Sequence, residues 1–152
     1  MSAGFDPSEE LTLFATYATI VLLKMLLMAP MTAYHRITKN VFANPEDATG
    51  HSQKDKKVIF NDPDVERVRR CHLNDLENIV PFFGLGLLYA LVSGASLTVI
   101  TWHYRVFVIS RILHTVAYIG ALPQPSRGLC FLTGLLVNVS MAVQILRNAA
   151  QF

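Results

Sequence analysis

Residues 67–77 read RVRRCHLNDLE, and they lead without a turn signal into the largely apolar run of residues 79–100. Burying an arginine or an acidic residue within a transmembrane helix costs about 2.5 to 3.5 kcal/mol on insertion scales. The stretch is therefore typical of a charged helix that enters a membrane. Its charges need partners or a function, and we look for the functional site here first.

The composition of the whole chain favours a membrane protein. The 152 residues are 52% apolar and 16% charged, and the mean hydropathy is +0.37. About 20 helical residues cross a hydrocarbon layer of roughly 30 Å, and four apolar blocks reach that length. The predicted fold class is thus an all-α integral membrane bundle of four transmembrane helices in a single domain, 1–152. The spans are expected at about 11–36, 65–93, 97–120 and 127–150, with a loop at about 37–64.

The third block is the least lipid-like of the four, so it should face other helices. It is interrupted by His103, Arg105, Arg111 and His114. The first block carries the single charge Lys24, with Pro30 near its far end. In the last block the polar residues are expected to pack rather than react; they are Asn138, Ser140 and Gln144.

The distribution of basic residues predicts the orientation. Eight of the thirteen lysines and arginines lie between Arg36 and Arg70. Because basic loops stay on the cytosolic side, the loop at about 37–64 is predicted to be cytosolic. An even number of spans then places both termini on the lumenal side. The first apolar stretch is too long for a cleaved signal sequence, so we interpret it as an uncleaved span.

The cytosolic loop ends at a helix start. Asp62 as N-cap and Pro63 at the first helical position fit the usual preferences. Within the loop, residues 42–47 are expected to be ordered because Asn-Pro begins a turn after an aromatic residue. Residues 49–57 are rich in Lys, Ser, Gln and Gly and are expected to be mobile.

On a helix, the charged stretch divides into two polar faces. One stripe contains Arg67, Arg70, Asn74, Glu77 and Pro81, and the other contains Arg69, His72 and either Asp75 or Leu76. In an oligomer the two faces could serve two different neighbours. Guanidinium groups match carboxylates, and a glutamate could take an ammonium group. Together they would suit a small zwitterionic peptide with several carboxylates.

A simpler explanation is that the arginines and glutamates pair with one another at helical spacing and solvate the entrance of the helix. Two residues argue against it. Glu77 lies deep, close to a proline within the apolar run, and Asn74 carries no charge to pair.

Near the end of the third block, Arg111, His114, Thr115 and Tyr118 share one side of the helix. Arg111 could simply pair with Asp75 or Glu77, and His114 and Thr115 could bond across the bundle. Tyr118 lies toward the cytosolic end, where a ligand contact is the better explanation. Arg127 begins the last helix, where a positive charge is unfavourable by about 0.3 to 1 kcal/mol. It therefore indicates either an anionic ligand or a positive-inside anchor.

Four segments, taken together, resemble a known family. They are residues 39–47 with FANPED, residues 65–77 with VERVRRCHLNDLE, residues 114–118 with HTVAY and residues 122–125 with LPQP. The chain is similar in these segments to the MAPEG family of membrane proteins in eicosanoid and glutathione metabolism. The resemblance implies a homotrimer of four-helix subunits in the endoplasmic reticulum or the outer mitochondrial membrane. Glutathione would bind between neighbouring subunits, near the cytosolic side.

Matched position by position, the resemblance implies roles for particular residues. Arg127 and Tyr118 would be catalytic by holding the glutathione thiolate, and Asp75, Arg111 and His114 would support the site. Glutathione would be the co-substrate, without a metal ion, and the thiolate would attack hydrophobic electrophiles or lipid hydroperoxides arriving from the membrane lipid. The implied glutathione contacts are Arg36, Arg69, Arg70, His72, Asn74, Glu77, Tyr118 and Arg127.

The resulting expectation is a detoxifying glutathione transferase with glutathione peroxidase side activity. An eicosanoid isomerase of the prostaglandin E synthase type is one alternative. Those enzymes carry a serine where this chain has Gly128 and an arginine where it has Leu73, which favours the transferase. A noncatalytic lipid-binding scaffold is the other alternative. The net charge of +2 gives no case for a nucleic-acid partner.

Overall fold

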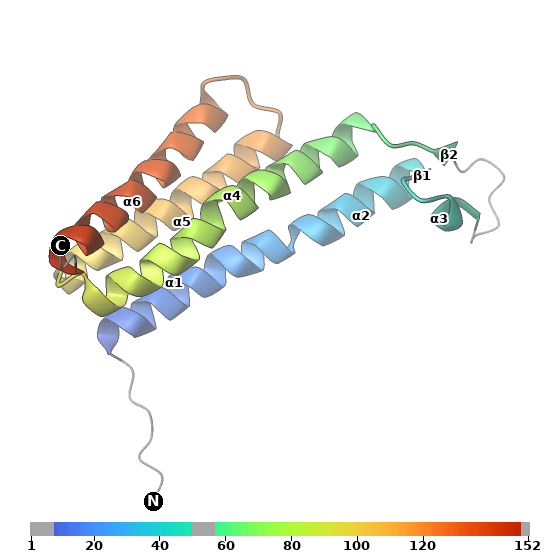
Figure 1. Cartoon of the computed structure of the whole chain (residues 1–152). Coiled ribbons are helices and arrows are strands. Elements are labelled where there is room, and N and C mark those ends of the chain that lie inside the picture. The colour runs from blue at the N-terminus through green and yellow to red at the C-terminus, as the bar shows by residue number, and fades with distance from the viewer. Residues whose placement is uncertain (1–7, 50–56, 150–152) are drawn as a thin grey trace, which may run out of the picture.

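The chain forms an elongated bundle of long helices with a small strand pair at one end (Figure 1). The computed structural model describes residues 8–49 and 57–149. Apart from the strand pair, the described fold is helical, as predicted. The long helices are α1 (Glu9–Leu26), α2 (Met28–Lys39), α4 (Pro63–Val92), α5 (Leu97–Ile119) and α6 (Ser126–Ala149). The short elements are β1 (Val41–Phe42), α3 (Pro45–Thr49) and β2 (Lys57–Val58).

The chain has the build of an integral membrane protein. Three helical segments of the described residues are long and apolar enough to cross a membrane: Glu9–Lys39, which joins α1 and α2, and helices α4 and α6. Helix α5 has 23 residues but is less apolar, because two arginines and two histidines interrupt it. It packs against α1, α4 and α6, which agrees with the expectation that this segment faces other helices.

A break at Leu27 divides the first long helical segment into α1 and α2. Pro30 explains the position of the break. Proline has no N–H to donate, so the carbonyl of Leu26, four residues earlier, loses its helical partner. Hydrogen bonds continue on both sides, from Leu27 N to Leu23 O at 3.2 Å and from Met31 N to Leu27 O at 3.1 Å. The two helices therefore follow one another nearly in line (Figure 1).

Local signals at both ends of α4 work as predicted. The Asp62 carboxylate accepts hydrogen bonds from Asp64 N at 3.0 Å and Val65 N at 3.1 Å, and Pro63 opens the helix. Lys39, at the end of α2, forms ion pairs with Asp62 and Asp64. These contacts fasten the end of α2 to the start of α4. The helix ends at Val92, and residues 93–96 form the expected turn before α5.

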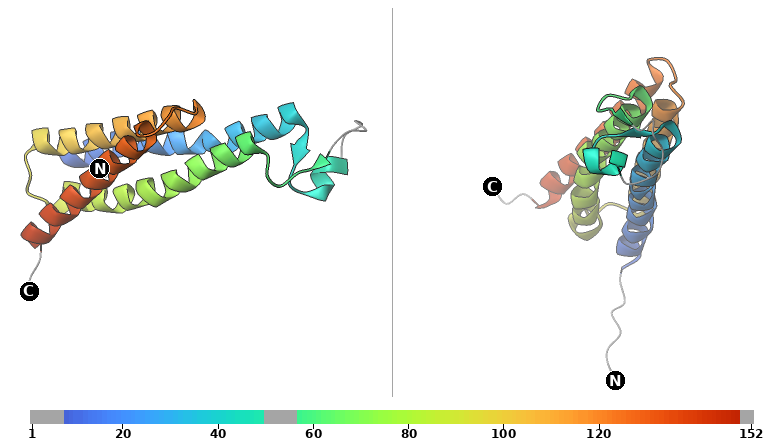
Figure 2. Two further views of the ribbon diagram at one scale, coloured as in Figure 1. Left: turned by 90° about the horizontal axis from the view of Figure 1, so that it is seen from above. Right: turned by 90° about the vertical axis from the view of Figure 1, so that its right-hand side faces the viewer.

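The connection between α2 and α4 carries the small elements. β1 and β2 form a parallel pair in which Val41 lies opposite Lys57 and Phe42 opposite Val58. Of the residues 42–47 that were expected to be ordered, Phe42 lies in β1 and residues 45–47 lie in helix α3. The expectation for residues 49–57 falls mostly outside the described residues. Figure 2 shows that these small elements extend the bundle beyond the ends of α2 and α4.

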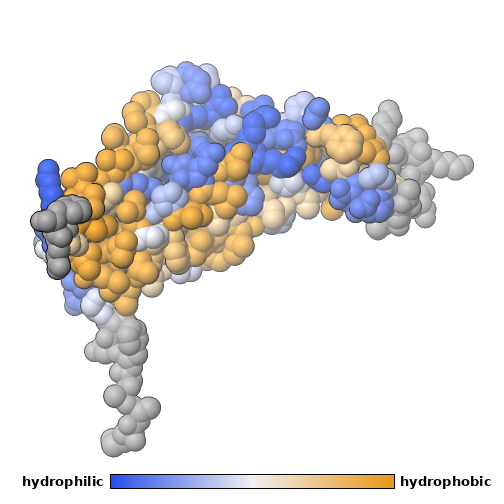
Figure 3. All heavy atoms as spheres, in the orientation of Figure 1, coloured by the Kyte–Doolittle hydropathy of each residue, from blue (hydrophilic) through white to orange (hydrophobic). Residues whose placement is uncertain are grey.

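Aromatic side chains hold α1, α4 and α5 together. The rings of Phe82 and Phe107 stack with their centroids 3.9 Å apart. The Tyr104 hydroxyl donates a hydrogen bond to Gly86 O at 2.8 Å, and the Phe14 ring lies against the same glycine. On the face seen in Figure 3, apolar residues dominate toward the end where α1 begins, and hydrophilic residues gather toward the opposite end. The predicted site residues lie at that opposite end.

Candidate functional site

The predicted site residues come from four helices that meet at one end of the bundle. Arg36 lies in the last turn of α2, and Tyr118 lies in the last turn of α5. Arg127 lies in the first turn of α6. The remaining predicted contacts lie in the first half of α4. Because the chain direction alternates along the bundle, these helix ends fall on the same side (Figure 1).

The structure brings the two predicted catalytic residues together. The guanidinium carbon of Arg127 lies 5.1 Å from the centroid of the Tyr118 ring, which is the geometry of a cation–π contact. Both side chains are half-buried. Within the described part of the chain, the buried Arg127 Nε has no hydrogen-bond partner. Among the described residues the Arg127 charge has no acidic partner, and its place beside the Tyr118 ring suits an anionic ligand.

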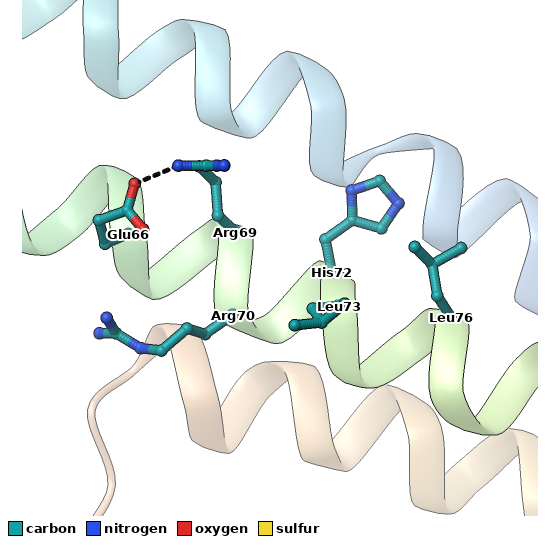
Figure 4. A pocket seen from close by; sticks show the side chains of 6 residues that line it. All are labelled: Glu66, Arg69, Arg70, His72, Leu73 and Leu76. Carbon is teal, nitrogen blue, oxygen red and sulfur yellow. Dashed lines mark hydrogen bonds and ion pairs between the residues drawn. The ribbon is translucent and has the colours of Figure 1, made fainter. Parts of the chain in front are cut away.

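A pocket of about 300 Å³ lies along α4 (Figure 4). Arg69 forms an ion pair with Glu66 at 2.6 Å, while Arg70 extends toward the other side of the helix (Figure 4). All of the lining residues belong to α4, so a single helix forms the wall of this pocket. They are Glu66, Arg69, Arg70, His72, Leu73 and Leu76. Of the two alternatives left open by the sequence, Leu76 lies with Arg69 and His72 on the surface of α4, because Asp75 is buried.

Most of the residues of α2 and α4 that are predicted to contact glutathione do not pair with one another. In residues 8–49 and 57–149, Arg36, Arg70, His72 and Glu77 make no hydrogen bond or ion pair with another side chain. Two of the predicted contacts do have side-chain partners: Arg69 pairs with Glu66, and Asn74 accepts a hydrogen bond from Arg111. Mutual pairing of arginines and glutamates therefore does not account for the polar faces of the charged stretch at residues 67–77. Its cationic and anionic groups stay available to a ligand.

Behind this surface lies a buried ionic cluster. Asp75 and Arg111 are both fully buried, with Arg111 Nη2 lying 3.3 Å from Asp75 Oδ1. Lys24 reaches Asp75 from α1. Arg111 Nη2 also donates to Asn74 Oδ1 at 2.6 Å and lies 3.1 Å from His114 Nδ1. Of the two partners suggested by the sequence for Arg111, the structure selects Asp75, while Glu77 is exposed.

The expectation that His114 and Thr115 bond across the bundle is only partly met. His114 bonds to Arg111 on its own helix, one turn earlier. Thr115 donates to Arg111 O at 3.2 Å and lies 3.8 Å from the Cys71 sulfur on α4. The rings of His114 and Tyr118 lie 5.5 Å apart. A continuous series of contacts thus runs from Asp75 through Arg111 and His114 to Tyr118.

Sequence reasoning noted Lys24 but did not assign it a partner. The signal was available, because a single charge within an apolar span requires a partner in the bundle. Nothing in the sequence, however, states which of several acidic residues that partner is. Lys24 and Asp75 are 51 positions apart, and their pairing depends on how α1 and α4 are rotated against each other.

The polar residues of α6 pack, as predicted. Asn138 Nδ2 donates to Asn78 O at 3.2 Å, Ser140 Oγ lies 3.0 Å from His103 Nε2, and the Tyr89 hydroxyl donates to Gln144 Oε1 at 2.5 Å. A largely apolar hollow of about 370 Å³ lies between α5 and α6 beside the His103 and Ser140 pair.

Comparison with known proteins decides the family. The sequence model of the MAPEG family matches residues 14–147. The chain belongs to the MAPEG family. The resemblance seen in its motifs is therefore confirmed.

The relatives of this MAPEG chain include microsomal glutathione S-transferases and prostaglandin E synthases. It is 54% identical to microsomal glutathione S-transferase 1 of Mus musculus over 143 residues, which cover 93% of this chain and 92% of the relative. It is 53% identical to the human protein of the same name over 142 residues, covering 92% and 91%. Its identity to human prostaglandin E synthase is 41% over 144 residues, covering 95% and 93%. This MAPEG chain is thus more similar to these transferases than to that synthase.

Proposed function

We propose that this MAPEG protein is a membrane-bound glutathione S-transferase that joins the glutathione thiolate to hydrophobic electrophiles. The observation that carries the proposal is the pairing of Arg127 with Tyr118, where a buried guanidinium nitrogen stays free beside a phenol. The identity of 53–54% to relatives named as such transferases supports it. Human prostaglandin E synthase is less similar, at 41% identity. Gly128 and Leu73 also stand where the resemblance implies a serine and an arginine in an isomerase of that type.

The chemistry requires that a thiol become an anion. A free thiol has a pKa near 8.5, and each tenfold gain in ionisation requires about 1.4 kcal/mol of preferential interaction with the thiolate. The Arg127 guanidinium supplies charge-assisted donors, and the Tyr118 hydroxyl supplies one more. In a partly dry site, a few kcal/mol from such donors is sufficient to make the thiolate the main form at neutral pH.

The thiolate then attacks the electrophilic carbon of the second substrate. A bond forms between sulfur and carbon, and the leaving group departs with its electron pair. With a lipid hydroperoxide, the thiolate attacks the outer oxygen, and the O–O bond breaks to release the lipid alkoxide, which takes up a proton to become the alcohol. A second glutathione then reduces the sulfenic product, yielding glutathione disulfide and water. We include this peroxidase reaction in the proposal because it uses the same thiolate.

The remaining residues bind the peptide. Arg36, Arg69 and Arg70 present guanidinium groups that match the two carboxylates of glutathione. Glu77 takes the ammonium group, and His72 and Asn74 bond to the peptide backbone. Asp75, Arg111 and His114 hold Asn74 and Tyr118 from behind through the buried contacts.

We propose that the active form is a homotrimer. The one-sided pocket on α4 supports this, because a neighbouring subunit can supply the opposite wall. We further propose that α5 also spans the membrane, in the interior of the bundle. Together with the three more apolar segments it makes four spans. The loop between α2 and α4 would be cytosolic, and both termini would be lumenal. The endoplasmic reticulum and the outer mitochondrial membrane are the proposed locations, which a fractionation of cells expressing the chain would test.

The test of the function uses the purified full chain in detergent micelles, with glutathione and a small aryl halide. We expect conjugation that depends on glutathione and a loss of about 100-fold in Arg127→Ala, because a hydrogen bond to a charged group contributes up to about 3 kcal/mol. Arg147→Ala is the matched control, since Arg147 is exposed near the other end of the same helix. A wild-type chain without conjugation, or with conversion of a prostaglandin endoperoxide as its main activity, would overturn the proposal.

A further inference from the structure

The buried cluster behind the candidate site contains two cations and one carboxylate. The Asp75 and Arg111 side chains are 0% exposed, and the Lys24 side chain is 12% exposed. Both cations contact the same carboxylate, Lys24 at Oδ2 and Arg111 at Oδ1. The three residues come from α1, α4 and α5, so the cluster lies at the junction of three helices.

No other described group compensates the second cation. A guanidinium only donates hydrogen bonds, so His114 Nδ1 must accept from Arg111, and the imidazole is therefore neutral. The other titratable groups facing the cluster are the Cys71 thiol of α4 and the Cys130 thiol of α6, which carry no charge as thiols. Arg127, at the start of α6, acts on the neighbouring His114 and adds a further positive charge on that side. Among the described residues, the cluster formed by Lys24, Asp75 and Arg111 holds one positive charge in excess.

The excess charge lies toward the candidate site. Arg111 Nε and Nη1 are buried and have no partner in the described part of the chain. Its third nitrogen, Nη2, bonds to Asn74, a proposed glutathione contact, and to His114, which lies against Tyr118. Inside a protein, charges are screened far less than in water, so a cation behind the site acts on an anion within it.

We propose that Lys24 is a positioning residue that keeps this excess positive charge in place and thereby favours the glutathione thiolate. Lys24 neutralises Asp75, which leaves the Arg111 charge uncompensated. Lys24 does not touch the substrate and acts through Asp75 and Arg111. The inference rests on the proposed transferase function and adds a second source of positive potential to Arg127.

The inference predicts opposite effects for the two partners of one ion pair. At an effective dielectric constant of about 20, a unit charge about 12 Å from any ionising group changes its ionisation constant about tenfold. Lys24→Met removes the excess charge and should lower that constant about tenfold. Asp75→Asn adds to the excess and should raise it. The double variant Lys24→Met/Asp75→Asn keeps the original excess charge, so the ionisation constant of its bound thiol should equal that of the wild type.

If Lys24 and Asp75 only fastened α1 to α4, both single variants would impair the site in the same direction. The sign therefore separates an electrostatic role from a structural one. Lys24→Arg keeps both the charge and a donor, so it should leave the ionisation midpoint unchanged. Lys39→Met is a matched control, because it also removes a lysine paired with aspartates, but at the exposed end of α2.

The experiment titrates the ultraviolet absorbance of bound glutathione thiolate against pH, with the full chain in detergent micelles. Calorimetric binding of S-methylglutathione, which cannot ionise at sulfur, reports an intact site in each variant. We expect the pH midpoint of thiolate formation to rise by about one pH unit in Lys24→Met and to fall in Asp75→Asn. The midpoint should not change in the double variant, in Lys24→Arg or in Lys39→Met. If Asp75→Asn does not bind S-methylglutathione, the contrast between Lys24→Met and Lys24→Arg decides.

An unchanged midpoint in Lys24→Met, with normal S-methylglutathione binding, would overturn the inference and leave the transferase function standing. The same would follow from shifts of equal sign in the two single variants. Failure of the wild-type chain to form a bound thiolate at all would instead count against the proposed function. The two failures are therefore distinguishable in one set of titrations.

Discussion

The Arg127 guanidinium lies over the Tyr118 ring, with its carbon 5.1 Å from the ring centroid, and so joins the first turn of α6 to the last turn of α5. The connection between these helices contains two prolines, Pro123 and Pro125, which limit its conformations. The prolines restrict the backbone of the connection, but they do not orient the Arg127 side chain. The contact with the Tyr118 ring does so. It also gives the phenol two separable roles, one for its ring and one for its hydroxyl.

Substitutions at Tyr118 should separate these roles. Tyr118→Phe keeps the ring beneath Arg127 and removes the hydroxyl, so we expect a loss of about 10- to 100-fold in kcat/KM, from a hydrogen bond to a charged group of about 1.5 to 3 kcal/mol. Tyr118→Leu removes both and should lose more. Steady-state conjugation of an aryl halide measures both variants. Equal activity in wild type and Tyr118→Phe would exclude a role for the hydroxyl.

Glu77 should contribute to glutathione binding and little to folding. Its side chain is exposed in the subunit, so Glu77→Gln should change the free energy of unfolding by less than about 0.5 kcal/mol. The dissociation constant of glutathione should rise about 10- to 100-fold, because the ammonium group loses a charged acceptor. Calorimetric titration checks this. The control is Glu9→Gln at the opposite end of the bundle, where the dissociation constant should not change.

The two glycines of α4 should respond differently to alanine. A Cβ at Gly86 would lie 3.0 and 3.1 Å from two atoms of the buried Phe14 ring, whereas a Cβ at Gly84 meets nothing within 4 Å in the subunit. Gly86→Ala should therefore cost about 1 to 3 kcal/mol through overpacking between α1 and α4. Gly84→Ala should be neutral or stabilising by up to about 1 kcal/mol. Thermal unfolding in detergent compares them, and an equal effect would contradict the packing described for Gly86.

The cap of α4 should stabilise the protein in a pH-dependent manner. The backbone hydrogen bond from Val65, together with Lys39, lowers the pKa of the Asp62 carboxyl below its ordinary value. A lowered pKa in the folded state means that the stabilisation is complete above the unfolded value of about 4 and is lost as the pH falls through the folded one. Asp62→Ala should cost about 1 kcal/mol near neutral pH.

Melting temperatures of wild type and Asp62→Ala, followed from neutral to acidic pH, test this prediction. The two curves should differ near neutral pH and converge below about pH 4. Asp62→Asn keeps a capping oxygen without a titrating charge, so its melting temperature should lack this contribution to the pH dependence. A constant difference between wild type and Asp62→Ala down to the lowest pH would show that the carboxylate charge is not involved.

Local signals in the sequence predicted the helices well because their causes are local. The apolar runs, the Asp62 cap, Pro63 and the turn at residues 93–96 each act within a few residues, and the structure agrees with them. The break at Leu27 has an equally local cause in Pro30. A helix with this composition could have bent or broken at that proline, so its presence alone did not define where α1 ends.

Contacts between helices could be predicted only in part. Helical spacing grouped Arg69 with His72, but it left Asp75 and Leu76 as alternatives for the same face. Asp75 is buried because two cations, Lys24 and Arg111, approach it from α1 and α5. Which residues meet in this way depends on the depth and rotation of each helix, and a single sequence contains no direct record of either. The roles of the ligand contacts stay predictions until glutathione binding is measured.

The one-residue break at Leu27 separates two mechanical parts of the N-terminal helical segment. Lys24 lies on the α1 side of the break and Arg36 on the α2 side. Lys39 ties the outer end of α2 to the start of α4, so Arg36 belongs to a pair of helix ends that are fastened together. Lys24, on the other side of the break, is anchored in the interior of the bundle through Asp75.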